Sequence, residues 1–239
     1  MHGPRLFRRR LVWLPTWWGA LVVLVFVCSL AAGTARHLGT WLAPNAPAVG
    51  RDGRGASTLI VEGWLDDDVL DDALDAVRHG RYARVVTSGG PIETWREIQP
   101  WASYAERAAE HLRRQGLQSI PVVALPARQM ANERTYLSAL VVRDWLRGQG
   151  IAREDVDLFS AGVHARRSRL VYRIAFGPDV AIGILAARPR RYDVERWWDT
   201  SEGAKAVLGE LLGLAWTKCC FWPEPSSSAP EHAAQKPPA

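Results

Sequence analysis

The sequence predicts an α/β fold of three layers, with a mostly parallel, doubly wound sheet, preceded by one transmembrane helix. Short apolar runs, typical of strands buried on both faces, alternate with longer segments that have helical periodicity. An uncharged apolar run, residues 11–33, lies close to the start of the chain. The 239 residues, 48% of them hydrophobic, suffice to bury one sizeable core, so we expect one folded domain.

Residues 11–33 predict a membrane-spanning helix. At the helical rise they reach roughly 34 Å, enough to cross a bilayer core. Four arginines precede this run within residues 1–10, whereas only Arg36 closely follows it. The positive-inside rule then places residues 1–10 in the cytoplasm and the domain outside, as a single-pass protein of the cell membrane. A signal peptide cleaved after Ala35 is the alternative, but the run is longer than the usual h-region of about 7–15 residues.

Composition argues against two other classes of protein. The net charge is +5, and four of these charges lie in residues 1–10, so the remainder is too balanced for a nucleic-acid-binding surface. Of the three cysteines, Cys28 lies in the apolar run, while Cys219 and Cys220 are adjacent. No disulfide framework or zinc spacing results, and we expect the adjacent pair to be unbridged.

Residues 34–57, rich in Pro, Gly and Ala, predict a linker, and residues 223–239 a disordered tail. The folded domain is therefore residues 58–222, and we expect its core to use none of residues 1–40. Leu70, Leu74 and Val77 share one helical face, and Gly116 and Gly148 stop two later helices. The predicted strands are 58–62, 84–87, 121–125, 155–160 and 179–185, and the predicted helices are 66–80, 101–115, 131–146, 164–176 and 201–214. Strands joined by helices in this way predict right-handed crossovers and a Rossmann-like sheet.

Polar residues follow the first two strands, at the sheet edge where ligands of such folds bind. Glu62 ends the first strand, and Glu93 lies beyond the second; both are candidate proton-transfer groups. The second strand also runs into Ser88, Gly89 and Gly90. We expect the two glycines to adopt positive φ and to turn their N–H groups toward an anion, although a tight turn alone would also explain them.

The start of the helix at 164–176 carries two further candidates. His164 and Arg167 are three residues apart, and a helix N-terminus with an arginine suits a phosphate or carboxylate. His164 is also a candidate catalytic residue. The alternative is structural, with His164 capping the helix and Arg167 paired with Glu62 or Glu93. A second row on this helix, Arg166, Arg169 and Arg173, fits a solvated face or a contact with anionic lipid.

Arg134 and Thr135 begin the helix at 131–146 and are candidate ligand-binding residues at the same edge, although capping alone would explain the threonine. The acidic run within residues 66–72 resembles a magnesium site, but acids are favoured at a helix N-terminus, so we assign no metal. No G-x-G-x-x-G after a strand, no P-loop, no H-E-x-x-H and no G-x-S-x-G occurs. Ordinary dinucleotide-binding, P-loop, zincin and α/β-hydrolase functions are therefore disfavoured.

In their order along the chain, these motifs resemble the YdcF-like (ElyC/SanA/YdcF) family of DUF218 domains. The resemblance covers residues 58–214. It rests on Glu62-Gly63, Ser88-Gly89-Gly90 followed by Glu93, Arg134-Thr135 and His164-Ala165-Arg166-Arg167. The sequence departs from the family at two places, with Val61-Glu62-Gly63-Trp64 in place of a Gly-rich loop and Asn132-Glu133-Arg134-Thr135-Tyr136 in place of an S-x-N-T-x-E-N helix start.

The resemblance implies a membrane-anchored, extracytoplasmic protein of the bacterial cell envelope. Its expected role is to bind or process a phosphorylated or polyprenyl-linked small molecule. Because one relative is associated with S-adenosylmethionine, a non-catalytic nucleotide-like binding module is an alternative, and an envelope scaffold is another. The sequence does not decide whether the protein is an enzyme, and it identifies no cofactor.

Overall fold

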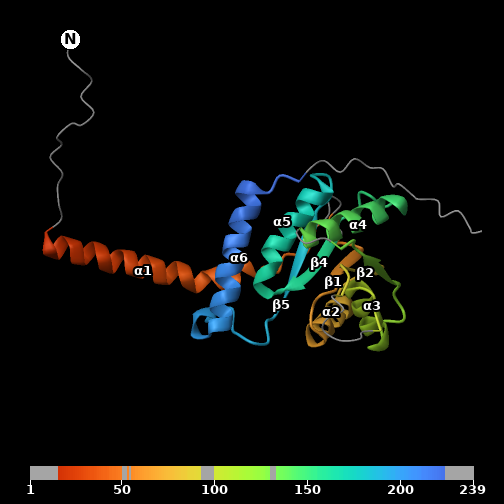
Figure 1. The fold of residues 1–239 in the computed structure, drawn as a ribbon, viewed down its shortest axis with the longest axis horizontal. Coiled ribbons are helices and arrows are strands. Elements are labelled where there is room, and N and C mark those ends of the chain that lie inside the picture. The colour runs from red at the N-terminus through yellow and green to blue at the C-terminus, as the bar shows by residue number, and fades with distance from the viewer. Residues whose placement is uncertain (1–15, 50–52, 54, 93–99, 130–132, 224–239) are drawn as a thin grey trace, which may run out of the picture.

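The computed structural model describes residues 16–49, 53, 55–92, 100–129 and 133–223. Its centre is one five-stranded sheet in which every neighbouring pair is parallel, in the order β3-β2-β1-β4-β5 (Figure 1). The strands are β1 (Thr58–Glu62), β2 (Arg84–Gly89), β3 (Val122–Pro126), β4 (Val156–Ala161) and β5 (Ile182–Ala187). The predicted α/β class with a parallel sheet is thereby confirmed.

Helices cover both faces of this sheet. Leu59 and Val61 of β1 pack against α2 (Asp67–His79) and α3 (Tyr104–Arg114), whereas Ile60 faces α4 (Arg134–Gly148) and α5 (Ala165–Phe176). Since successive strand residues point to opposite faces, both faces of an apolar strand are buried. The strand order reverses between β1 and β4, and in sheets of this kind the ligand crevice lies at that point, beyond the carboxyl ends of the strands.

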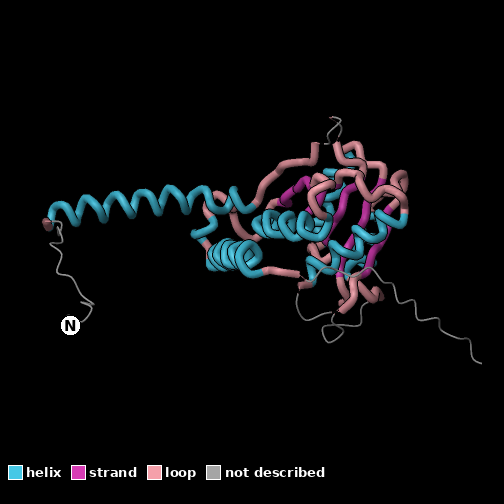
Figure 2. The backbone as a smooth tube through the Cα atoms, turned by 90° about the horizontal axis from the view of Figure 1, so that it is seen from above, coloured by secondary structure: helices cyan, strands magenta, loops and turns pink. Residues whose placement is uncertain are grey.

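Helix α1 (Trp17–Leu42) projects from the domain (Figures 1 and 2). Among the described residues it is the one helix long and apolar enough to cross a membrane, and none of its most apolar window is buried. It continues past the predicted end of the span at residue 33, and Gly39 and Leu42 near its end are buried. Trp197 Nε1 donates a 2.9 Å hydrogen bond to the carbonyl of Ala35.

The expectation that the core uses none of residues 1–40 is therefore wrong. The predicted span ends at residue 33, before the first charged residue that follows it, Arg36. That side chain lies on the exposed face of α1, while Leu38 and Leu42 pack into a core cluster. Further along, Ala46 exchanges two backbone hydrogen bonds with Ile184, and Ala48 N donates to the buried Asp157 carboxylate at 2.6 Å. This part of the predicted linker is bonded to the edge of the sheet.

The chain ends its described part with α6 (Ser201–Cys220), which packs on α5, on α1 and on the short helix η1 (Gly162–His164). A second short helix, η2 (Trp197–Asp199), leads into it. The structure joins Cys219 and Cys220 in a disulfide at the end of α6, contrary to the expectation of an unbridged pair. The bond joins neighbouring residues at the end of α6, and the sequence alone does not show whether adjacent cysteines bridge.

Candidate functional site

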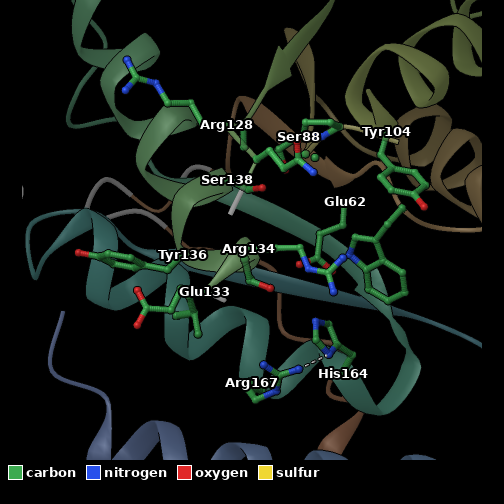
Figure 3. A pocket seen from close by; sticks show the side chains of 18 of the residues that line it. Glu62, Ser88, Tyr104, Arg128, Glu133, Arg134, Tyr136, Ser138, His164 and Arg167 are labelled. Carbon is green, nitrogen blue, oxygen red and sulfur yellow. Dashed lines mark hydrogen bonds between the residues drawn. The ribbon is translucent and has the colours of Figure 1, made fainter. Parts of the chain in front are cut away.

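A pocket of about 1110 Å³ opens beyond the carboxyl ends of the strands. Eight of the nine predicted site residues line it (Figure 3): Glu62, Ser88, Gly89, Gly90, Arg134, Thr135, His164 and Arg167. The ninth, Glu93, lies outside the described residues. The topology brings these side chains together, because parallel strands end at a common edge.

Glu62 is the buried carboxylate of the pocket, with 2% of its surface exposed. Its Oε2 accepts a 2.5 Å hydrogen bond from Ser160, and its Oε1 accepts one of 2.8 Å from Ser168. No described cation lies within ion-pair distance of it. Burying a carboxylate is costly unless hydrogen bonds or charges compensate, so two hydroxyl donors from β4 and α5 fix this group while leaving it on the pocket wall.

Ser88 lies beside Glu62, since the two residues are paired across β1 and β2. Its hydroxyl is 3.0 Å from that of the fully buried Tyr172. Burial, reinforced by the negative charge of Glu62, raises the pKa of Tyr172 far above its ordinary value. Tyr172 therefore stays a neutral phenol behind the pocket wall, where its hydroxyl lies against that of Ser88, a residue that lines the pocket.

The predicted anion-binding turn at Gly89 and Gly90 is wrong in its geometry. Neither glycine is among the described residues with positive φ. Gly89 instead continues β2, where a Cβ would lie 2.9 Å from Cβ of Tyr104, so this glycine permits close packing of α3 on the sheet. Gly90 faces open space and its carbonyl accepts from Tyr104 N at 2.9 Å. The sequence pattern alone does not distinguish close packing from a left-handed turn.

His164 and Arg167 do lie together, but the carboxylate between them is one that the sequence reasoning missed. Arg167 Nε donates to Glu210 Oε2 at 2.7 Å, and His164 Nδ1 lies 2.8 Å from Glu210 Oε1. The two structural alternatives therefore do not hold for these residues as stated. Arg167 pairs with Glu210 rather than with Glu62, and the His164 side chain does not cap its helix. A signal was present in the sequence: Glu210 is the sole charged residue between Lys205 and Lys218 in an otherwise apolar helix.

The Glu210 carboxylate is held ionised in this arrangement. Burial would raise its pKa, but hydrogen bonds from His164 and Arg167 outweigh that effect and lower the pKa to about 2. Arg167 Nη2 also lies 3.0 Å from His164 Nδ1 (Figure 3). When His164 Nδ1 carries the proton shared with Glu210, Nε2 is the nitrogen that remains for other partners. Gly213 makes room for this cluster, since a Cβ there would lie 3.1 Å from the Arg167 side chain.

Two arginines, Arg134 and Arg128, line the pocket without a described partner, and Arg134 is the one directed into it (Figure 3). Arg134 is exposed at the first turn of α4, and no other described residue forms a hydrogen bond or ion pair with it. Figure 3 shows its side chain extended across the pocket toward Glu62, whereas Arg128 at the rim points away. The preceding residue, Glu133, has a φ of 62°, a left-handed conformation uncommon for residues other than glycine. Thr135 lines the pocket but is not the N-cap of α4, because that residue is Glu133.

Aromatic side chains form the other part of the wall, and the sequence reasoning did not place most of them there. They are Trp64, Tyr104, Tyr136, Trp216 and Phe221. Trp64 is 42% exposed and meets His164 edge to face, with ring centroids 5.2 Å apart. An exposed indole face beside a cationic cluster can stack on a planar ligand or cover its apolar part.

The acidic residues at the start of α2 are held by cations from other elements. Arg107 pairs with Asp67 at 2.8 Å, and His111 with Asp71 at 2.8 Å. Arg190 binds Asp72 at 2.7 Å. Over the described part of the chain, no group of three metal-ligating side chains converges. The acidic run thus ties α2 to α3 and to the segment after β5.

The second arginine row of α5 is only partly solvated. Arg166 stacks over the Trp41 ring at 4.1 Å and donates to its carbonyl, and Arg169 donates to the carbonyl of Ile182 at 2.6 Å. Desolvation lowers the pKa of both guanidinium groups, more than neighbouring charges do for Arg169. Two members of the row therefore hold α5 to α1 and to β5.

Comparison with known proteins gives no match to any family profile, to any curated protein or to any solved structure.

Proposed function

We propose that the pocket binds a phosphorylated small molecule next to the membrane, as expected for a YdcF-like protein of the bacterial envelope. The observation that carries this proposal is Arg134, a cation without a described partner that extends into an open pocket. A guanidinium in a pocket favours a phosphate, which it can bind with two parallel hydrogen bonds. Arg167, fixed by Glu210, offers further N–H donors in the same pocket, and His164 lies beside it (Figure 3).

In this proposal, Glu62 is the group that accepts a proton when the ligand is converted. An ionised carboxylate repels a phosphate, so the anionic group belongs near Arg134, and a hydroxyl or water belongs near Glu62. With both oxygens oriented by Ser160 and Ser168, the carboxylate is positioned to accept a proton from such a group. The envelope scaffold is the least favoured alternative, because the pocket is open rather than filled.

A non-catalytic binding module is the second candidate, favoured by the half-exposed Trp64 in the wall. Glu62→Gln separates the two functions. A catalytic carboxylate predicts that this variant still binds the ligand but no longer converts it, whereas a binding module predicts that no conversion occurs in either protein. Ligand retained on purified protein, followed over time by mass spectrometry, gives the measurement.

The binding proposal is tested on the full chain purified in detergent. Native mass spectrometry should find a phosphorus-containing adduct on the wild type, and inorganic pyrophosphate should raise its melting temperature. Both effects should be lost in Arg134→Ala and kept in Arg147→Ala, a matched arginine at the exposed end of the same helix. A wild type that carries no such adduct and ignores pyrophosphate contradicts the proposal.

The proposed location is the outer face of the cell membrane, with α1 as a single-pass anchor and the N-terminus in the cytoplasm. Four arginines before the span and one closely after it support this orientation. Alkaline phosphatase fused after Pro223 should be active in cells. An inactive fusion, together with a fluorescent protein that matures at the same site, would reverse the orientation.

A further inference from the structure

Helix α6 has an apolar outer face that the domain leaves uncovered. Leu208, Leu212 and Trp216 follow each other at intervals of four residues and are 48%, 71% and 53% exposed. The inner face, which includes the buried Val207 and Leu214, packs into a core cluster. A helix that is apolar all round is normally one whose faces both avoid water. In α6, none of the described elements covers the outer face.

A membrane-spanning role does not explain this helix. Of the described helices, only α1 combines the length and apolarity of a span. Helix α6 carries Glu202, Lys205, Glu210 and Lys218 within its 20 residues. Its two lysines lie near the ends and are exposed, as they would be where ammonium groups reach toward phospholipid headgroups. With one apolar face buried in the domain and the other exposed, and with charged residues toward its ends, α6 fits a helix that lies in the plane of a bilayer interface.

The position of α1 locates that bilayer. Its exposed apolar part gives way to contacts with the domain at Ala35, and Leu42 shares a core cluster with Val207 and Leu214 of α6. The stretch from Ala35 to Leu42 rises only about 10 Å. A membrane crossed by α1 would therefore end close to α6. Figures 1 and 2 show α6 lying across α1, as the outermost element at the end of the domain from which α1 leaves.

We infer that α6 is an interfacial helix, with Leu208, Leu212 and Trp216 inserted at the boundary between headgroups and acyl chains of the bilayer that α1 crosses. Two further tryptophans are exposed on elements next to α6: Trp198 on η2 is 41% exposed, and Trp41 on α1 is 42% exposed. Exposed tryptophans are enriched at membrane interfaces. This inference depends on α1 crossing a membrane, and it holds whatever the pocket binds. Because Trp216 also lines the pocket, the bilayer surface would then adjoin the pocket mouth.

The test measures lipid contact at the outer face of α6 in the full chain. Cys28, Cys219 and Cys220 are replaced by alanine, and an environment-sensitive fluorophore is attached to Leu212→Cys in phosphatidylcholine vesicles. A phospholipid spin-labelled near the carbonyl end of its acyl chain should quench this fluorophore more than one labelled near the methyl end. The same label at Arg114→Cys, on the exposed end of α3 and 68% exposed before substitution, should not be quenched.

Leu208→Cys provides a second position, and a melting temperature equal to that of the unlabelled protein shows that each variant is folded. Equal, negligible quenching at residues 212 and 114 in folded protein would overturn the inference. So would protection of residue 212 from a water-soluble quencher without any quenching by lipid. With cross-linking between cysteines of two copies, that second result would assign the face to a dimer.

Discussion

Glu210 lies 2.7 Å from Arg167 and occupies the position expected for a ligand, for Glu62 or for Glu93. Helix α6, which carries Glu210, is distant in the sequence from α5, so the residue pattern of α5 does not predict the ion pair between Arg167 and Glu210. Because Glu210 already compensates Arg167, Arg134, which has no partner among the residues that the structure describes, becomes the stronger candidate for anion binding. Arg167 then acts as a fixed hydrogen-bond donor beside His164 rather than as a free cation.

Glu210→Gln keeps the shape of the side chain and removes its charge. Breaking a buried pair on one side costs about 3–5 kcal/mol, and we expect the lower end of that range because the pair is partly exposed. The melting temperature of the full chain in detergent gives the measurement. Glu202→Gln is the control, since its partner Arg191 is highly exposed and such surface pairs contribute little to stability. Equal melting temperatures for the two variants would show that the cluster is not stabilising.

The same carboxylate predicts a pH dependence. Its pKa is lowered from an ordinary 4.5 to about 2 in the folded protein, so the unfolded chain binds more protons between these values. The stabilisation is complete above about pH 4.5 and is lost as the pH falls toward 2. The difference in melting temperature between the wild type and Glu210→Gln should therefore shrink over this window. A difference that stays constant down to pH 2 would contradict the assigned pKa.

The two neighbouring glycines of the pocket should respond differently to alanine. A Cβ at Gly89 would meet Tyr104 at 2.9 Å and Ala105 N at 3.2 Å, so Gly89→Ala should destabilise the fold by about 1–3 kcal/mol. A Cβ at Gly90 meets nothing within 4 Å. Gly90→Ala should change stability by less than about 0.5 kcal/mol, and any effect on ligand binding would come from the pocket itself. Chemical unfolding of both variants measures the contrast, and equal losses would argue against it.

The sheet was predictable because each buried strand is recognisable from a short apolar run of its own residues. A strand buried on both faces is mostly apolar, so the strand at 58–62, with Leu59, Ile60 and Val61 at its centre, was recognisable in the sequence. The convergence of Glu62, Ser88 and His164 followed from the rule that parallel strands end together. Contacts that depend on tertiary packing were missed: the role of Glu210, the orientation of Gly89 and the continuation of α1 into the core. In each of these three cases, the residue that makes the contact lies on another helix or strand, outside the local stretch of sequence.

The last two turns of α1 provide the final prediction, because they test whether this helix is docked or merely tethered. A Cβ at Gly39 would lie 2.0 Å from the carbonyl oxygen of Val194 and 3.0 Å from Trp197, so Gly39→Ala must displace backbone. We expect a loss of about 1–3 kcal/mol, against a gain in helix propensity of at most about 1 kcal/mol. Gly33→Ala, two turns earlier on the same helix, has no neighbour within 4 Å and should leave the melting temperature unchanged or slightly raised. If Gly39→Ala were as stable as Gly33→Ala, α1 would be attached to the domain only through the chain, and the bilayer would not be held against α6.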